Sequence, residues 1–284
     1  MSSGAKIFFG AGAGRCGSMM LANLLNAEDR VLALHEGKIR KREESKQQRL
    51  PFLTLENFQA YAKPEQAKQI FADRRKGVAT IIADENLRAF GDIAYNNSPF
   101  VAAIPKVFPK ARLIVLVRDG RDFVRSVYTS DRPDPTPVGW LDADVELSDL
   151  ERYIALGRLR PLPADPVANK WPTMSAVAKN AWLWAETYRV VMDGVESSWN
   201  QDQVMIVRAE DMFADPAEKY HEIRDFLGFR WPVSPDVETL LKVQINARPG
   251  NSSYLLPKHP EWDKFTGDDF WAYAFATMDR LGYK

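Results

Sequence analysis

The sequence predicts an α/β fold in which a mostly parallel central sheet is covered by helices on both faces. Short apolar segments are well separated along the chain, and each is followed by loop or helix signals. The almost wholly apolar segment Arg112–Val117 leads into a turn and a helical pattern, which is typical of a strand buried on both faces of a parallel sheet. A helical stripe of apolar side chains indicates a covering helix; it comprises Val177, Ala181, Trp184, Tyr188 and Val191. We therefore expect a three-layer, P-loop-like architecture.

These elements are expected to form a single domain over residues 1–284. The predicted strands are Lys6–Phe9, Val31–His35, Val78–Ala83, Arg112–Val117 and Val204–Arg208. Residues from about 130 to 171 are rich in proline and acidic side chains, and only a short helix is expected there, around Asp149–Leu156. Because core elements flank this segment on both sides, we expect an irregular lid or insertion.

The composition narrows the class of partner. Lys and Arg together number 38, as do Asp and Glu, so no global field favours nucleic acid or an anionic membrane, and a small partner is expected. The single cysteine excludes an internal disulfide, and three scattered histidines argue against a metal site. No apolar run is long enough to span a membrane, and the early Gly-rich loop leaves no room for a signal peptide. We expect a cytoplasmic protein without a metal; its oligomeric state is not indicated.

A Gly-rich loop follows the first predicted strand, in the stretch "KIFFGAGAGRCGSMMLANLL". Gly12 and Gly17 have the spacing of a Walker loop, but Ser18 stands where the lysine of an NTPase belongs. Gly12, Gly14 and Gly17 also fit the dinucleotide pattern G-x-G-x-x-G, with the acidic residue Glu36 near the expected spacing. In a third interpretation, Arg15 replaces the missing lysine as the cation for a terminal phosphate. In every case the N–H groups at the start of the following helix would hold the anion.

A second basic motif, "LVRDGRDFVRSVY", favours the third interpretation. It places Arg118 at the carboxyl end of a buried strand and Ser126 about two turns into the following helix. Ligands of open α/β sheets bind at that edge, so the arginine and the hydroxyl can form a second phosphate site. One loop for one phosphate and an Arg/Ser pair for another describe a nucleotide that is phosphorylated at both ends of its ribose.

With these motifs the chain resembles a sulfotransferase that uses 3′-phosphoadenosine 5′-phosphosulfate (PAPS). The loop "GAGRCGSMML" is similar to the family's 5′-phosphosulfate loop, in the Arg variant of tyrosylprotein-type and many bacterial members. "VRDGRDFVRSVY" is similar to the 3′-phosphate signature, and "VRAEDMFADP" resembles the family's R-Y-E-D-L…D-P segment. The family's Asp-Lys-x-Pro element appears as Asp84-Glu85-Asn86-Leu87, and its C-terminal basic-Gly element as the approximate Arg248-Pro249-Gly250.

The resemblance implies a role for each motif residue. The 5′-phosphate would be bound by Gly12, by Arg15 and by the backbone amides of Gly14–Ser18, which include those of Cys16 and Gly17. Arg118 and Ser126 would bind the 3′-phosphate, with Arg248 and Gly250 near the same nucleotide. Arg15 would also neutralise charge that develops on the leaving group, since sulfuryl transfer asks mainly for positioning and charge stabilisation, as phosphoryl transfer does.

An acceptor hydroxyl also needs a general base, and the end of the second predicted strand is where we expect it. His35 and Glu36 lie there, and strand alternation predicts that they face opposite sides. Periodicity does not choose between them. The resemblance favours Glu36, because tyrosylprotein-type sulfotransferases carry a catalytic glutamate shortly after the phosphate loop.

The predicted activity is transfer of a sulfuryl group from PAPS to a hydroxyl, or to an amine, of a small molecule, glycan or peptide. Two alternatives remain open from the sequence. One is an NAD(P)-dependent oxidoreductase built on the same glycines. The other is a nucleotide-binding protein that keeps both phosphate sites without turnover.

Overall fold

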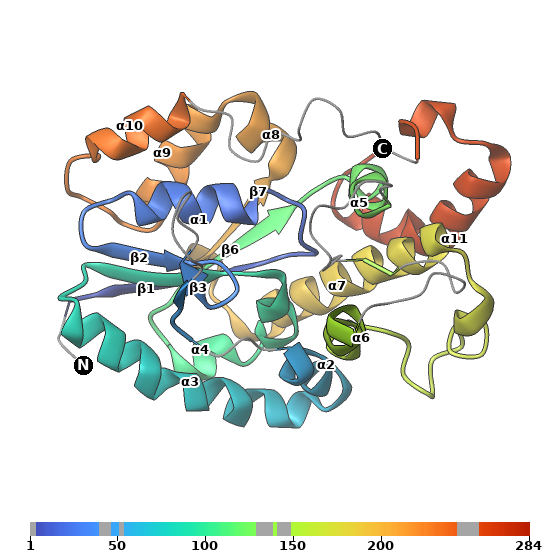
Figure 1. The fold of residues 1–284 in the computed structure, drawn as a ribbon, viewed down its shortest axis with the longest axis horizontal. Coiled ribbons are helices and arrows are strands. Elements are labelled where there is room, and N and C mark those ends of the chain that lie inside the picture. The colour runs from blue at the N-terminus through green and yellow to red at the C-terminus, as the bar shows by residue number, and fades with distance from the viewer. Residues whose placement is uncertain (1–3, 40–46, 51–53, 129–138, 141–148, 243–255) are drawn as a thin grey trace.

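The computed structural model describes residues 4–39, 47–50, 54–128, 139–140, 149–242 and 256–284. At its centre is a five-stranded, wholly parallel sheet with the strand order β2-β5-β1-β6-β7 (Figure 1). Its strands are β1 (Lys6–Ala11), β2 (Val31–Leu34), β5 (Ala89–Ile93), β6 (Arg112–Val117) and β7 (Val204–Arg208). A separate two-stranded ribbon consists of β3 (Lys38–Ile39) and β4 (Gln47–Gln48). The expected mostly parallel sheet is confirmed.

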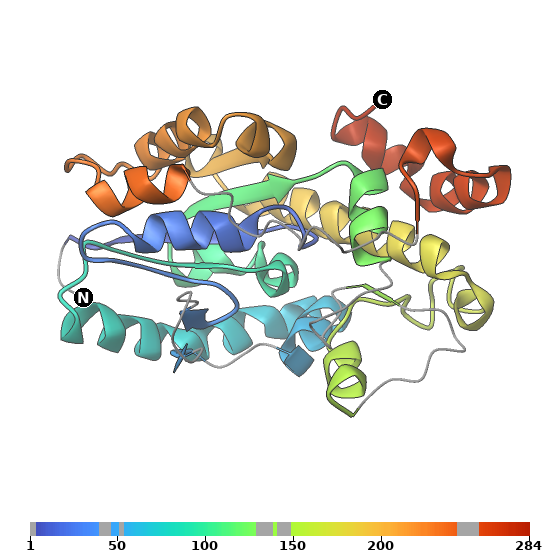
Figure 2. The same ribbon diagram turned by 45° about the horizontal axis from the view of Figure 1, so that its top comes forward.

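Helices cover both faces of this sheet, which confirms the three predicted layers (Figures 1 and 2). One face packs against α1 (Ser18–Asn26), α8 (Ala209–Ala214), α9 (Pro216–Phe226) and α10 (Pro235–Leu241). The other packs against α2 (Thr54–Ala62), α3 (Pro64–Asp84), α4 (Ile104–Val107), α5 (Gly120–Val127), α7 (Ala176–Ser198) and α11 (Lys264–Arg280). Alternation divides each strand between the two cores, so Phe8 faces α1 while Phe9 packs against Phe71 of α3.

The predicted strand Val78–Ala83 is wrong, because these residues form the last turns of α3. The buried residues of α3 are Ala67, Phe71, Arg74, Val78 and Ile81, a spacing of three and four that marks one face of a helix. A short apolar run does not distinguish a buried strand from a buried helix by its composition. The strand that pairs between β1 and β2 is instead β5, whose Gly91 and Asp92 have low strand propensity.

Three other predicted elements agree closely with the structure. β6 and β7 have the predicted bounds, and α6 spans Asp149–Leu156 as expected. β2 ends one residue early, at Leu34. Much of the predicted lid, residues 130–138 and 141–148, lies outside the described residues.

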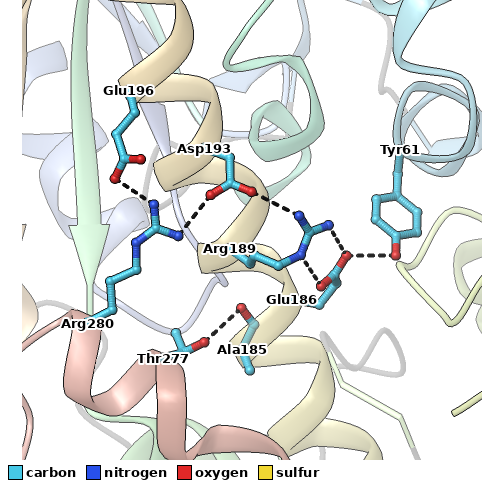
Figure 3. A network of polar contacts seen from close by, with 8 residues as sticks. All are labelled: Tyr61, Ala185, Glu186, Arg189, Asp193, Glu196, Thr277 and Arg280. Atoms are coloured by element: carbon cyan, nitrogen blue, oxygen red, sulfur yellow. Dashed lines mark hydrogen bonds and ion pairs between the residues drawn. The ribbon is translucent and has the colours of Figure 1, made fainter. Parts of the chain in front are cut away.

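A polar network on the surface joins α7 to its neighbours (Figure 3). Arg280 of α11 binds Asp193 at 2.9 Å and Glu196 at 2.6 Å, and Tyr61 of α2 donates a hydrogen bond to Glu186 at 2.8 Å. The side chains of Asp193 and Glu196 are 48% and 64% exposed, so these ion pairs contribute little to stability individually. Burial, followed by the charge of Glu186, raises the pKa of Tyr61, so its phenol remains a donor to that carboxylate. Within the described parts of the chain, no helix is long and apolar enough to cross a bilayer.

Candidate active site

The Gly-rich loop lies between β1, the central strand, and α1, as the sequence predicts. Its backbone is left-handed at Gly14 (φ 83°), Arg15 (φ 56°) and Gly17 (φ 83°). At Gly12 a side chain is excluded by close approach, because a Cβ there would lie 2.3 Å from the carbonyl oxygen of Leu116 in β6. The loop therefore turns tightly against the neighbouring strand.

The amino end of α1 presents backbone donors to this loop. Gly17 is the N-cap, no side chain of the described residues caps the helix, and its first turn holds no acidic residue. The first N–H groups of a helix lack partners within the helix and carry partial positive charge, which favours an anion. The loop residues Gly14–Ser18 are thus suited to hold a phosphate.

The two predicted phosphate sites touch one another. Arg118 directly follows β6, and its guanidinium donates a 2.6 Å hydrogen bond to the carbonyl oxygen of Arg15. The Nε of Arg15 in turn donates to the hydroxyl of Ser126 in α5 at 3.1 Å. Arg15 is exposed, whereas Ser126 is 7% exposed. The predicted residues therefore form one continuous basic surface at the carboxyl edge of β1 and β6.

The neighbouring charges of the second motif have structural partners. Asp119 is the N-cap of α5 and forms an ion pair with Arg121. Arg125 donates to the carbonyl oxygen of Leu256 at 3.1 Å. Of the three arginines after β6, it is Arg118 that reaches the phosphate loop.

The third motif, residues 207–216, meets the other two at the same edge. Glu210 in α8 accepts a hydrogen bond from the backbone N–H of Asp119 at 2.8 Å. Met212 packs on the phosphate loop so closely that a Cβ on Gly17 would lie 2.1 Å from its terminal methyl. This segment therefore packs against both the phosphate loop and the start of α5.

The candidate bases lie in a tight turn after β2. His35 and Lys38 exchange backbone hydrogen bonds of 2.8 and 3.2 Å around Glu36 (φ 57°) and Gly37 (φ 74°), the geometry of a type I′ hairpin turn. A left-handed residue with a Cβ costs about 1–2 kcal/mol, so Glu36 occupies a strained position of the kind that clusters at functional sites.

The expectation that His35 and Glu36 face opposite sides is wrong, because Glu36 belongs to the turn rather than to the strand. The Nδ1 of His35 lies 3.9 Å from a carboxylate oxygen of Glu36, and its Nε2 lies 3.1 Å from the hydroxyl of Ser18. His35 therefore lies beside the amino end of α1, and the Glu36 carboxylate lies next to His35. The histidine is 8% exposed and bridges the glutamate and the phosphate loop.

Two titratable groups beside the loop stay neutral near neutral pH. Burial raises the pKa of the Cys16 thiol to about 11, although the nearby Arg118 opposes the shift. The Cys16 side chain therefore stays a protonated thiol rather than a thiolate. Tyr95 lines the pocket formed by Gly12, Gly14 and Ser18; burial and then the charge of Glu36 raise its pKa.

Sequence reasoning missed the residues that hold the loop and the turn in place. The hydroxyl of Ser98 accepts from the Gly12 N–H at 3.0 Å and donates to the Gly12 carbonyl at 2.9 Å. Asn97 donates to the carbonyl oxygens of Gly10 and Asp92, at 3.1 and 2.9 Å. The available signal was the polar run "YNNS", residues 95–98, which begins two residues after the end of β5.

Two predicted cofactor residues, Arg248 and Gly250, lie outside the described residues. Over the described ranges, no group of three or more His, Cys, Asp or Glu side chains is arranged to hold a metal ion.

Comparison with known proteins identifies the family of this chain. The family model for the sulfotransferase domain matches residues 8–245, which include all three motifs. The fold resembles a sulfotransferase domain from the curacin biosynthetic pathway, with a TM-score of 0.54 and 14% identity over 99% of this chain and 98% of that one. It also resembles a sulfotransferase from Mycobacterium avium, with a TM-score of 0.56 and 12% identity over 99% of this chain and 78% of that one. No curated protein sequence matches the chain. With its motifs gathered at one sheet edge and its family model spanning most of its length, the chain belongs to the sulfotransferase domain family.

Proposed function

We propose that this protein is an enzyme that transfers a sulfuryl group from PAPS to a hydroxyl, or to an amine, of a small molecule, glycan or peptide. The observation that carries the proposal is the contact between the two basic motifs. Arg118 binds the backbone of Arg15, and Arg15 binds Ser126, so cations from β1 and β6 meet at one edge of the sheet. Such a surface suits a nucleotide with phosphates on both sides of its ribose.

The donor side of this site consists of the loop Gly12–Ser18 with Arg118 and Ser126. The loop amides and the Arg15 fork would bind the 5′-phosphate, because a helix start and a planar guanidinium both favour a phosphate oxygen. Arg118 and Ser126 would bind the 3′-phosphate, which distinguishes this donor from ATP. Cations at the bridging oxygen stabilise the charge that grows there as the bond to sulfur breaks.

The base side of the site is the turn His35–Lys38. In the proposed step the acceptor oxygen loses its proton to the Glu36 carboxylate and forms a bond to sulfur, while the bond from sulfur to the 5′-phosphate oxygen breaks. The products are a sulfate ester and adenosine 3′,5′-bisphosphate. Glu36 is preferred to His35, because the histidine Nε2 already lies 3.1 Å from the Ser18 hydroxyl and that ring is more deeply buried.

We infer that this arrangement resembles the tyrosylprotein type, in which an arginine in the phosphate loop accompanies a catalytic glutamate shortly after that loop. The nicotinamide alternative is disfavoured by family membership and by the proximity of Arg118 to the loop. A binding protein without turnover would need neither a strained Glu36 nor its carboxylate beside His35, the residue that contacts Ser18 of the loop.

Two experiments test the proposal. In a thermal shift assay, adenosine 3′,5′-bisphosphate should raise the melting temperature of the protein, whereas NAD at the same concentration should not. A panel of hydroxyl and amine acceptors, incubated with isotopically labelled donor and read by mass spectrometry, should reveal a labelled sulfated product. Stabilisation by NAD alone would exclude the donor. Bisphosphate binding without any sulfated product across acceptor classes would favour the non-catalytic alternative.

A further inference from the structure

The turn that carries Glu36 is held by a residue from a different strand. Asp92 lies in β5, where its backbone is in register with Leu34 of β2 and Phe9 of β1. Its carboxylate is 1% exposed, and Oδ1 accepts a hydrogen bond from the backbone N–H of Gly37 at 3.1 Å. The bond therefore joins the interior of the sheet to the residue directly after Glu36.

Asp92 is held in turn by a buried cation. Arg74 of α3 donates to Oδ2 of Asp92 at 3.1 Å, and the two side chains are 6% and 1% exposed. A buried carboxylate without a counter-charge would be costly, and an ion pair of good geometry fixes both partners. Arg74 thus leaves one carboxylate oxygen for the turn and holds the other.

The backbone of Asp92 is tied to the phosphate loop as well. Asn97 donates to the carbonyl oxygen of Asp92 and to that of Gly10, which directly precedes the loop region. Asp92 is therefore connected both to β1, the strand that leads into the phosphate loop, and to the turn that carries Glu36.

We propose that Asp92, supported by Arg74, is a positioning residue that holds the strained Glu36–Gly37 turn against the phosphate loop. This inference rests on the proposed function, since it assigns Asp92 a role in sulfuryl transfer through Glu36. Asp92 itself does not touch the reacting atoms.

The chain offers a matched control. Glu28 and Arg224 form another buried carboxylate–arginine pair, at 2.7 Å, with side chains that are 0% and 9% exposed. Glu28 precedes β2 and therefore lies at the amino edge of the sheet, away from the loop. Its other partners are Tyr220 and Trp231, at 2.8 and 3.1 Å.

The test compares two double variants that leave no buried arginine unpaired. Asp92→Leu with Arg74→Met removes both charges and the acceptor for Gly37. Asp92→Asn with Arg74→Met removes the same charges but keeps an amide oxygen for the Gly37 N–H. The control is Glu28→Leu with Arg224→Met. Each is assayed well below its melting temperature, with and without Glu36→Gln.

We expect the leucine variant to lose about 10- to 100-fold in kcat with donor KM unchanged, because misplacing a base costs rate rather than binding. The asparagine variant should recover most of this loss, and the control should stay within about twofold of the native rate. In the Glu36→Gln background the leucine substitution should have no further effect, because residues that act as a unit are not additive. Any of three results would overturn the proposal. The leucine variant could keep the native kcat, the control could lose as much rate as the leucine variant, or the leucine variant could lose its full factor again in the Glu36→Gln background.

A readout without substrate separates this inference from the proposed function. Amide hydrogen exchange at Gly37, measured by NMR on glycine-labelled protein, should be protected in the native chain and in the asparagine variant and fast in the leucine variant. Unchanged protection of the Gly37 amide from exchange in the leucine variant would overturn the proposal that Asp92 holds the turn, even if Glu36→Gln abolishes turnover. Lost protection together with full turnover in Glu36→Gln would overturn the base, and the positioning role with it, although the contact itself would stand.

Discussion

The donor side and the base side of the site are constructed in different ways. The donor side uses residues within two strand–helix junctions, and its charged groups are partly open to solvent: Arg15 is exposed and Arg118 is half-buried. The base side depends on buried groups that are far apart in sequence, because Arg74 and Asp92 hold the turn that follows β2. In the proposed mechanism the binding groups therefore act locally, whereas the proposed base, Glu36, depends on a buried frame.

This difference implies that the two sides fail in different ways. Substitutions on the donor side should weaken nucleotide binding or reduce the stabilisation of the charge that develops on the leaving group. Damage to the base side should lower turnover while the nucleotide still binds. Four substitutions, in order of decreasing expected effect, test that division.

The largest loss is expected from Glu36→Gln, which keeps the shape of the side chain but cannot accept the proton. General-base assistance is worth about 10²–10⁴ in rate, so kcat should fall by that order. Steady-state kinetics with a saturating acceptor measures it. Turnover within a fewfold of native would show that the base lies elsewhere.

Arg15→Ala should lower kcat by about 10²–10³, the usual cost of one donor to a developing oxyanion, and should weaken donor binding less than that. Arg15→Lys should recover part of the rate, since it restores the charge without the planar fork. Rapid-quench kinetics of the chemical step distinguishes rate from affinity. An Arg15→Ala protein with native turnover would remove this residue from the mechanism.

Arg118→Ala should weaken binding of adenosine 3′,5′-bisphosphate by about 1.5–3 kcal/mol, which is roughly 10- to 150-fold in Kd, through loss of a charge-assisted contact. Adenosine 5′-phosphate, which lacks the 3′-phosphate, should bind the variant almost as well as the native protein. Titration calorimetry with both ligands measures this.

The matched control for Arg118 is Arg121→Ala. Arg121 comes from the same motif but is paired with Asp119, so its removal should change bisphosphate affinity by no more than about twofold. Equal losses for the two nucleotides in Arg118→Ala would mean that Arg118 is structural, through its bond to the Arg15 carbonyl.

His35→Gln should have the smallest effect, a loss of less than about tenfold in kcat. A glutamine amide can still bond to the Ser18 hydroxyl, so the loop keeps its contact while the imidazole is lost. If this variant is inactive and Glu36→Gln is active, the two roles are exchanged and His35 is the base.

The difference between local and long-range construction also explains which parts of the site could be predicted from the sequence. Arg15, Arg118 and Ser126 could be predicted as a phosphate site because each follows a strong strand signal at a suitable spacing. The structure shows that they touch one another, as the neighbouring positions of β1 and β6 require. Glu36 was predicted through resemblance, but its geometry was predicted wrongly, because alternation was extended to Glu36, two residues beyond the end of β2 at Leu34. The adjacent Glu36–Gly37 pair was the local sign of a turn.

The supporting residues could not be predicted because they depend on long-range pairing. Asp92 has a role only once β5 is known to lie between β1 and β2, and the apolar residues that end α3 were mistaken for a strand instead. In the sequence Arg74 resembles an ordinary surface charge. Its burial becomes evident only once Phe71 and Val78 are known to lie on the buried face of α3. Ser98 and Asn97 likewise act on backbone atoms more than 80 positions away.

The central claim, that the donor side binds and the base side removes the proton, is tested most directly by calorimetric titration of Glu36→Gln with adenosine 3′,5′-bisphosphate, beside Arg118→Ala. We predict that Glu36→Gln binds within about threefold of the native Kd despite its lost turnover, while Arg118→Ala binds at least about tenfold more weakly. A loss of affinity in Glu36→Gln as large as that in Arg118→Ala would contradict it.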